Sequence, residues 1–478
     1  VGGNIKLSLS KGLPGFEAEA SAMFGKTDFS YWYVDAKAVF PAGIPLGAVT
    51  LTGFSGGASY AMSKSTGTTL SNTTCKYIPS SNVGLGLKAG VLFAIARKEV
   101  VDCDASFEIL FNRYGGLNFI GFYGHAKFMG SLPGVSNISD YVSKVQTTAI
   151  KKENEYAARY GLDGLLNLKT TDPNKAANEL SDSKGKVQAG LNAQIAIEYG
   201  FANKNFDANF KVSAYVAKGL IRGCSANNIA GWSALHIDPN KWYLHMGTPT
   251  KPIGLTMGIS DVITASSKSY FMVGDGIPAA ATPPQEVMKI LNMSQNSLTS
   301  ARQLDELSTG RGFAFGSSLG FDTGDLRCLI FYARFNSQVG FDIMMKQYEN
   351  AYCRGCSGNI GLDGWYAQGQ VYAFLQGELG VTGKFIGKRY YFDIINGSAA
   401  TLLQAQLPNP TWMEGRIGVK YSFIHGAIKG SGHFDLSFGK RCDVITSQTS
   451  EVEFKLIKTT TPTTTADVFV VPQVSFSL

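Results

Sequence analysis

Two serines lie in the pattern that can place a catalytic nucleophile on a sharp turn. Ser55 lies in G-F-S-G-G at residues 53–57, and Ser318 lies in G-S-S-L-G at residues 316–320. A nucleophile elbow needs a strand before the serine and a helix after it. Both serines instead lie within glycine-rich runs of strand-like sequence. We therefore predict no catalytic serine and no enzymatic activity.

The histidines and carboxylates give no clear metal or acid–base site. His236 and His245, with Asp238 between them, are the residues that could converge on a metal ion. No two histidines have the H-x-x-x-H spacing, and residues 242–246 have the composition of an ordinary strand. Asp102 and Asp104 fall on one face of a strand, where solvated carboxylates are expected. Without a Walker loop, EF-hand loop or dinucleotide fingerprint, we expect neither a metal nor a cofactor.

Cysteine chemistry is restricted by the spacing of the seven cysteines. Cys353 and Cys356 form a C-x-x-C motif. A redox role would need a surrounding βαβ pattern, and a zinc site would need two further ligands. Neither is present, so the pair is interpreted as a local disulfide or as two plain thiols.

A more specific signal is an Arg-Gly-Cys-Ser-x-Asn segment followed by Gly-Trp, which occurs twice. The offsets between the copies are 356 − 224 = 132 for cysteine and 365 − 232 = 133 for tryptophan. Gly, Ser and Asn suit tight turns, and a tryptophan anchors the strand that follows. We interpret the segment as a corner of a duplicated unit of about 130–145 residues rather than as a ligand site. Its candidate residues are Cys224, Asn227, Trp232, Cys356, Asn359 and Trp365.

Composition indicates a β protein. The chain has 478 residues, including 55 glycines, 30 phenylalanines and 21 tyrosines, and only 17% of its residues are charged. Aromatic residues suit pleated surfaces and glycine suits turns. The net charge of +7 comes from scattered basic residues, which argues against a nucleic-acid surface.

Alternating apolar and polar residues predict long strands at 101–112, 206–217 and 427–438. Alternation favours antiparallel pairing over a buried parallel sheet. The expected fold is mainly β, with long antiparallel strands in stacked or curved sheets, duplicated β units and two helical insertions. Small residues such as Ala18, Ala20 and Ala22 favour tight sheet-on-sheet packing over a ligand groove.

We divide the chain into four β segments. Residues 1–86 form an N-terminal segment and residues 87–232 a first unit with a helical insertion at 139–183. Residues 233–365 form a second unit with a helical insertion at 282–309, and residues 366–478 form a C-terminal segment. No apolar run is long enough for a transmembrane helix. Since the chain begins Val-Gly-Gly in β-like sequence, we expect a processed product or a piece of a longer polypeptide.

Four segments carry a resemblance to known proteins, namely residues 29–40, 241–255, 270–278 and 364–380. They resemble segments of very large, mostly uncharacterised surface or secreted proteins of Bacteroidetes, some of which contain a TANFOR domain. The resemblance covers about a third of the chain and transfers no catalytic residue. It implies a location at the cell surface, associated with the outer membrane, or outside the cell.

Three functions remain open. The first, which we favour, is a non-enzymatic structural or assembly module that associates with itself or with neighbouring domains of the same polypeptide. The second is a β-groove that binds or transfers a lipid or another hydrophobic ligand, which would require an exposed apolar face larger than a soluble monomer tolerates. The third is an outer-membrane β-barrel. Against it stand the two helical insertions, the cysteines and the lack of clear aromatic girdles.

Overall fold

The fold is a single large antiparallel sheet. The computed structural model describes residues 2–9, 16–47, 49–64, 77–95, 101–128, 190–216, 219–259, 263–293, 309–328, 330–348, 351–354, 358–385, 388–442, 444–446, 457–461 and 473–476. The main sheet contains 21 strands. Three of these, β12 (Ile221–Gly223), β15 (Ile253–Ile259) and β18 (Leu326–Cys328), pair beside the long strands.

The other 18 strands form the body of the sheet. Its first half contains β1 (Gly2–Leu9), β2 (Phe16–Lys26), β3 (Ser30–Leu46), β4 (Val49–Tyr60), β7 (Val83–Ile95), β8 (Val101–Asn112), β9 (Leu117–Phe128), β10 (Gly190–Gly200) and β11 (Asn205–Val216). Its second half contains β13 (Ile229–Ile237), β14 (Trp242–Met246), β16 (Ile263–Gly274), β17 (Gly312–Asp322), β19 (Phe331–Gln347), β21 (Trp365–Phe385), β22 (Lys388–Leu407), β23 (Trp412–Phe423) and β24 (Ile428–Gly439).

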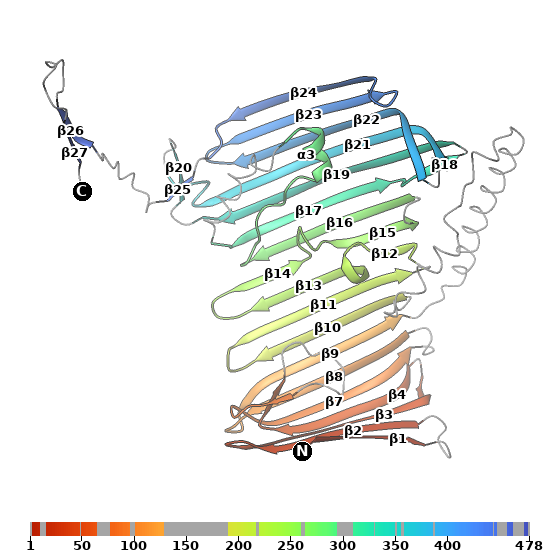
Figure 1. The fold of residues 1–478 in the computed structure, drawn as a ribbon. Helices are drawn as coiled ribbons and strands as arrows, with labels where there is room; N and C mark the ends of the chain where they lie inside the picture. Colours follow the sequence, from red (N-terminus) through yellow and green to blue (C-terminus); the bar gives the residue numbers. More distant parts are fainter. Residues whose placement is uncertain are drawn as a thin grey trace, which may run out of the picture.

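Each of these strands pairs antiparallel with the next one along the chain, from β1 at one edge to β24 at the other (Figure 1). The predicted alternating strands are confirmed as β8, β11 and β24. A mainly β fold built from long antiparallel strands is thus confirmed. The sheet crosses all the segment boundaries proposed from the sequence, because residues 86, 232 and 365 lie within β7, β13 and β21.

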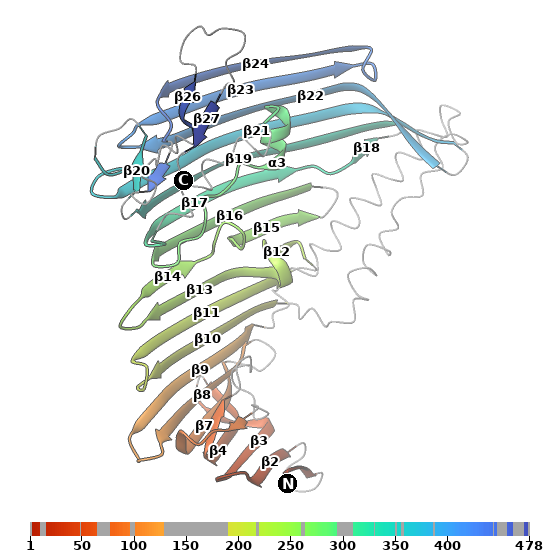
Figure 2. The ribbon, with the colours of Figure 1, turned by 60° about the vertical axis from the view of Figure 1, so that its left-hand side comes forward.

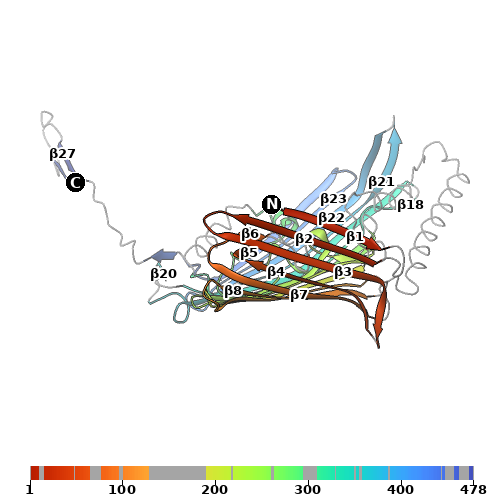
Figure 3. The same ribbon diagram turned by 90° about the horizontal axis from the view of Figure 1, so that it is seen from below.

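The sheet is one curved layer. Figures 1 and 2 show the strands following one another like rungs. Seen from below in Figure 3, the strands at both ends of the sheet curve toward the same side, which makes a trough. Among the described residues no second large sheet packs on either face of the main sheet, and the other sheets are two-stranded pairs. The expected sheet-on-sheet packing is therefore not found, and the small residues of β2 lie within a single layer.

Short elements lie on the concave side of the trough or beside the sheet. Two-stranded pairs are formed by β5 (Met62–Lys64) with β6 (Tyr77–Pro79), β20 (Ala351–Cys353) with β25 (Val444–Thr446), and β26 (Ile457–Thr461) with β27 (Gln473–Phe476). The helical elements are α3 (Gln285–Ile290) and the 3₁₀ turn η1 (Ala226–Asn228).

Helix is scarcer than the sequence indicates. The insertion expected at 139–183 lies outside the described residues. In the insertion expected at 282–309, the structure places a six-residue helix, α3, directly after Pro284. Val287 and Ile290 of this helix are buried against the sheet, while residues 294–308 lie outside the described part. In the portion that the structure describes, no helix has the length and apolar character needed to cross a membrane.

Candidate functional site

One face of the sheet is apolar across the whole row of strands. Side chains alternate between the two faces of a strand, and directly paired residues of neighbouring strands share a face. The register therefore assigns each residue to a face. One ladder on this side runs through Leu319, Val339, Ala373, Thr401, Ile417 and Phe434. We call this side the apolar face, and the opposite side, which includes Asp35 and Asp342, the polar face.

The apolar face is bare within the described structure. Leu319 is 60% exposed, Ile417 is 53% exposed and Phe434 is 61% exposed. Exposed apolar side chains on the same face begin at Phe24 in β2 and continue to Phe438 in β24. Soluble monomers rarely expose contiguous apolar patches larger than a few hundred Å². A face that extends over this many strands therefore needs a cover.

Charge is almost absent from the apolar face. Among the described side chains, the register places no aspartate, glutamate, arginine or histidine there. Its lysines are Lys26, the last residue of β2, and Lys388, the first residue of β22. The polar face carries the charged side chains of the same strands, such as Glu108, Lys211 and Arg416. The separation of charge between the faces is thus a property of the whole sheet.

Aromatic side chains occur at both ends of the strands on the apolar face. At one end, Trp32 of β3 pairs with Phe24 of β2 and with Tyr60 of β4. At the other end, Phe128 ends β9 and Phe423 ends β23. Aromatic side chains of the apolar face therefore lie at both ends of the strands, although the sequence alone did not indicate this arrangement.

The polar face lies inside the trough and is partly covered. Helix α3 packs on Tyr372, Phe374 and Leu402, which are buried beneath it. The β5–β6 hairpin covers the N-terminal part of the polar face, where Met62 and Tyr77 pack against Met23, Tyr31 and Tyr33. The described structure thus places its small buried clusters on the concave side and none on the convex apolar face.

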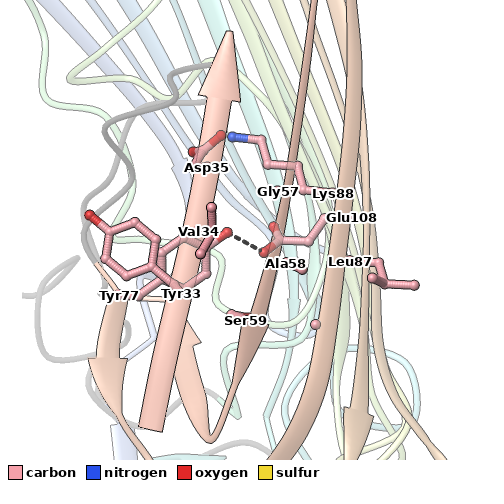
Figure 4. A pocket seen from close by; sticks show the side chains of 11 residues that line it. Tyr33, Val34, Asp35, Gly57, Ala58, Ser59, Tyr77, Leu87, Lys88 and Glu108 are labelled. Carbon is pink, nitrogen blue, oxygen red and sulfur yellow. Dashed lines mark hydrogen bonds between the residues drawn. The ribbon is translucent and has the colours of Figure 1, made fainter. Parts of the chain in front are cut away.

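Buried acidic groups lie under the β5–β6 hairpin (Figure 4). The Tyr77 hydroxyl donates a hydrogen bond to Glu108 Oε1 at 2.9 Å. Asp35 is only 3% exposed, and neither of its carboxylate oxygens has a hydrogen-bond partner. The Lys88 ammonium group points toward Asp35 from the neighbouring strands. Lys88 therefore supplies positive charge between two buried carboxylates, Asp35 and Glu108.

A second polar cluster borders a cavity of about 250 Å³ beside α3. Asp342 accepts hydrogen bonds from the Tyr270 hydroxyl and from Gln370 Nε2, both at 2.9 Å. Gln370 Nε2 also donates to the Ala281 carbonyl oxygen at 3.0 Å. Arg441 follows β24, lies over the Trp412 ring at 4.7 Å, and has a pKa lowered by burial. These contacts tie the segment before α3 to the sheet.

The histidine pair considered as a metal site does not converge. His236 contacts Asp207 at 2.6 Å through Nδ1 and Asp238 at 2.9 Å through Nε2. Asp238 lies in the turn before β14. The hydrogen bond with His236 and those from the backbone N–H groups of Asn240 and Lys241 lower its pKa to about 2. The His245 ring instead lies at a tilt beside the Tyr243 ring, with 4.8 Å between the ring centroids. No cluster of metal ligands is found in the part of the chain that the structure describes.

The two copies of the repeated segment lie in different settings. In the first copy, the Trp232 Nε1–H donates to the Lys251 carbonyl oxygen at 3.0 Å, and Trp232 lies on the polar face. In the second copy, Trp365 begins β21 and pairs with Gln347 on the apolar face. Cys224 and Asn227 lie between β11 and β13, whereas Asn359 lies between β19 and β21 at the opposite end of the sheet. The described residues of the two copies therefore lie at opposite ends of the sheet and do not occupy equivalent positions.

Cysteine pairing differs from the local pairing considered from the sequence. Cys353 of β20 forms a disulfide with Cys442, which follows β24. A Cys353–Cys356 disulfide is therefore not formed, since Cys353 already has a partner; Cys356 lies outside the described residues. Sequence spacing could not reveal this pair, because its members are 89 residues apart. Cys103 and Cys224 are free thiols.

Removal of this disulfide is expected to loosen the β20–β25 pair rather than the whole sheet. Replacing both Cys353 and Cys442 by serine should cost about 2 kcal/mol locally, at the lower end for a native disulfide, because β20 lies outside the main sheet. Hydrogen exchange at residues 351–354 should accelerate, with exchange in β22 unchanged. Cys224→Ser is the matched control. Two free thiols at Cys353 and Cys442 in the oxidised protein would contradict the assignment.

No known protein-family model matches the chain, and no curated protein matches it in sequence.

Proposed function

We propose that the chain is a non-enzymatic β-sheet scaffold embedded in a membrane, with its convex apolar face in contact with lipid acyl chains. One observation carries the proposal: the described apolar face is exposed across the sheet, and it holds charge only at strand ends. Lipid tails cover such a surface without requiring hydrogen bonds from it. The proposal places the structural module expected from the sequence at a bacterial cell envelope.

Strand length supports the proposal. Strands β8, β9, β11, β23 and β24 each have 12 residues, which corresponds to about 40 Å at roughly 3.3 Å per residue. A strand of this length, tilted by about 45°, rises close to the thickness of a bilayer hydrocarbon core, about 30 Å. The aromatic residues at both strand ends would then lie near the two interfaces, where tryptophan and tyrosine are enriched.

Curvature favours lipid over a second protein surface. The apolar face is convex because the ends of the sheet curve away from it, toward α3 (Figure 3). Two convex faces of this kind would touch over a narrow strip, whereas acyl chains adapt to any curvature. The same curvature argues against a lipid-carrying groove, since the concave side holds Asp342, Gln370 and the other polar side chains.

Two tryptophans on neighbouring strands give a direct test. Trp242 of β14 lies on the apolar face and is 44% exposed, whereas Trp232 of β13 lies on the polar face. Two variants each retain one of these residues, with the other four tryptophans replaced by phenylalanine. Each is reconstituted in phosphatidylcholine vesicles whose acyl chains are either brominated or unmodified. Brominated chains should quench Trp242 strongly and Trp232 only weakly.

Other outcomes would overturn the proposal. Equal quenching of Trp242 and Trp232 would mean that lipid does not distinguish the two faces. Failure of the folded chain to associate with vesicles, with both residues unquenched, would mean that another partner covers the apolar face. A stable, water-soluble dimer in which Trp242 becomes shielded would identify that partner as a second copy.

A further inference from the structure

The two edge strands of the sheet are unpaired on their outer sides among the described residues. Strand β1 pairs with β2, and β24 pairs with β23. Figure 1 shows them at opposite ends of the row of strands. An open edge presents a row of backbone N–H and C=O groups that can pair with another strand. In lipid such groups are still more costly to leave unpaired.

Strand β24 lacks the backbone features that block an edge, and its charged residues, Lys429 and Asp435, both lie on the polar face. All 12 of its residues pair with β23 without a register shift, and it contains neither proline nor bulge. Phe434, Leu436 and Phe438 are between 61% and 69% exposed. They continue the apolar face up to the edge, so a further strand beside β24 would extend this face.

The directions of the strands determine which strand can pair antiparallel with the open edge of β24. Of the 21 strands in the sheet, β12, β15 and β18 lie beside the long strands, which leaves 18 in the alternating row. Because this number is even, β1 and β24 run in opposite directions. A β1 strand placed beside β24 therefore pairs antiparallel, as every other strand of the row does. Both faces of the sheet then continue across the junction.

We propose that a second copy of this chain occupies the β24 edge through its own β1. The ends of the trough rise on the same side, as the positions of β1 and β23 in Figure 3 show. Two copies facing each other can therefore bring β24 of each to β1 of the other. A twofold axis along the strands relates such copies, and no edge strand is left unpaired.

Pairing of β24 with β24 would also be antiparallel, but it requires a twofold axis perpendicular to the sheet. That axis would give the two copies opposite orientations across the membrane. Copies inserted in the same orientation therefore cannot pair in this way. The choice of β1 as the partner edge rests in this respect on the proposed function. The use of the β24 edge itself does not.

Cysteine cross-linking tests the proposal on the full chain. All native cysteines other than Cys353 and Cys442 are first replaced by serine. One new cysteine is placed at Asn4 or Lys6 of β1 and one at Ser431 or His433 of β24, which gives four double variants. Oxidation in detergent micelles should produce a covalent dimer in at least one double variant. Single variants with a cysteine in β24 alone are the matched controls and should remain monomeric on a denaturing gel.

Each alternative gives a different result. Dimers of the β24 single variants would show pairing of identical edges and overturn the proposal. A disulfide that forms within one chain would show that the two edges of the same copy meet. Absence of any cross-link, together with a monomeric mass by light scattering, would show that the edge is free. These readouts do not depend on tryptophan quenching, so this proposal and the proposed function can fail separately.

Discussion

Leu375→Arg is expected to weaken membrane insertion of the folded chain by about 2–4 kcal/mol, the cost of arginine on a lipid-facing strand near the midplane of a bilayer. Leu375 lies in the middle of β21, is 46% exposed, and has Ser337 and Ala399 as its partners on the apolar face. No carboxylate on that face could pair with the new guanidinium group, which would have to enter the hydrocarbon region.

The matched control is Gln376→Arg, because Gln376 is the next residue of β21 and lies on the polar face beside Asn336 and Ser398. This variant should insert as the parent does. Folding into phosphatidylcholine vesicles, followed by urea titration, measures both variants. Equal losses for the two substitutions would show that general disruption of β21, not lipid contact, is responsible.

The strands themselves were accessible from sequence. Alternation at 101–112, 206–217 and 427–438 is a local signal, and a strand with one wet and one dry face produces it whatever covers the dry face. The structure places β8, β11 and β24 at these positions. Antiparallel order followed from the same pattern, since strands of a buried parallel sheet would be apolar on both faces.

What lies against the apolar face of the sheet could not be predicted from the sequence in this way. Ala18, Ala20 and Ala22 suggested a second sheet, because small residues permit close packing. In the structure, each of them pairs with an alanine or valine of β3 in the same layer. Alternation reports that a face is apolar, but it does not report whether protein or lipid lies against it. Only the register across all strands shows that the face is continuous and that its described residues carry charge only at strand ends.

Features that depend on long-range contacts were also beyond the sequence. Cys353 and Cys442 come together because β20 and β25 form a small separate sheet. Lys88, Asp35 and Glu108 come from three different strands, β7, β3 and β8. Their meeting depends on the register of β3 with β4, of β4 with β7 and of β7 with β8. No motif of consecutive residues could therefore predict that these three side chains lie together.

The second large effect is expected at this cluster. Lys88→Met should destabilise the fold by about 1–2 kcal/mol at pH 7, because burial already raises the pKa of Asp35 to about 6 and the carboxyl group takes up a proton once the positive charge of Lys88 is lost. Asp35 is 3% exposed and Glu108 is 2% exposed. Glu108 keeps the hydrogen bond from Tyr77, whereas the carboxylate oxygens of Asp35 have no hydrogen bond. Most of the cost should therefore come from Asp35.

A double-mutant cycle measures that cost. Asp35→Asn in the Lys88→Met background should restore most of the lost stability, because no carboxylate at this position then has to take up a proton. Lys211→Met, at an exposed lysine on the polar face of β11, should change stability by less than about 0.5 kcal/mol. Urea unfolding in detergent micelles measures the free energy of unfolding of the parent, Lys88→Met, Asp35→Asn and the double variant, which form the cycle, and of the Lys211→Met control. Glu108→Gln is made in the same Lys88→Met background for comparison. If it restores as much stability as Asp35→Asn does, the loss does not come mainly from Asp35, and the assignment of the cost to Asp35 is wrong.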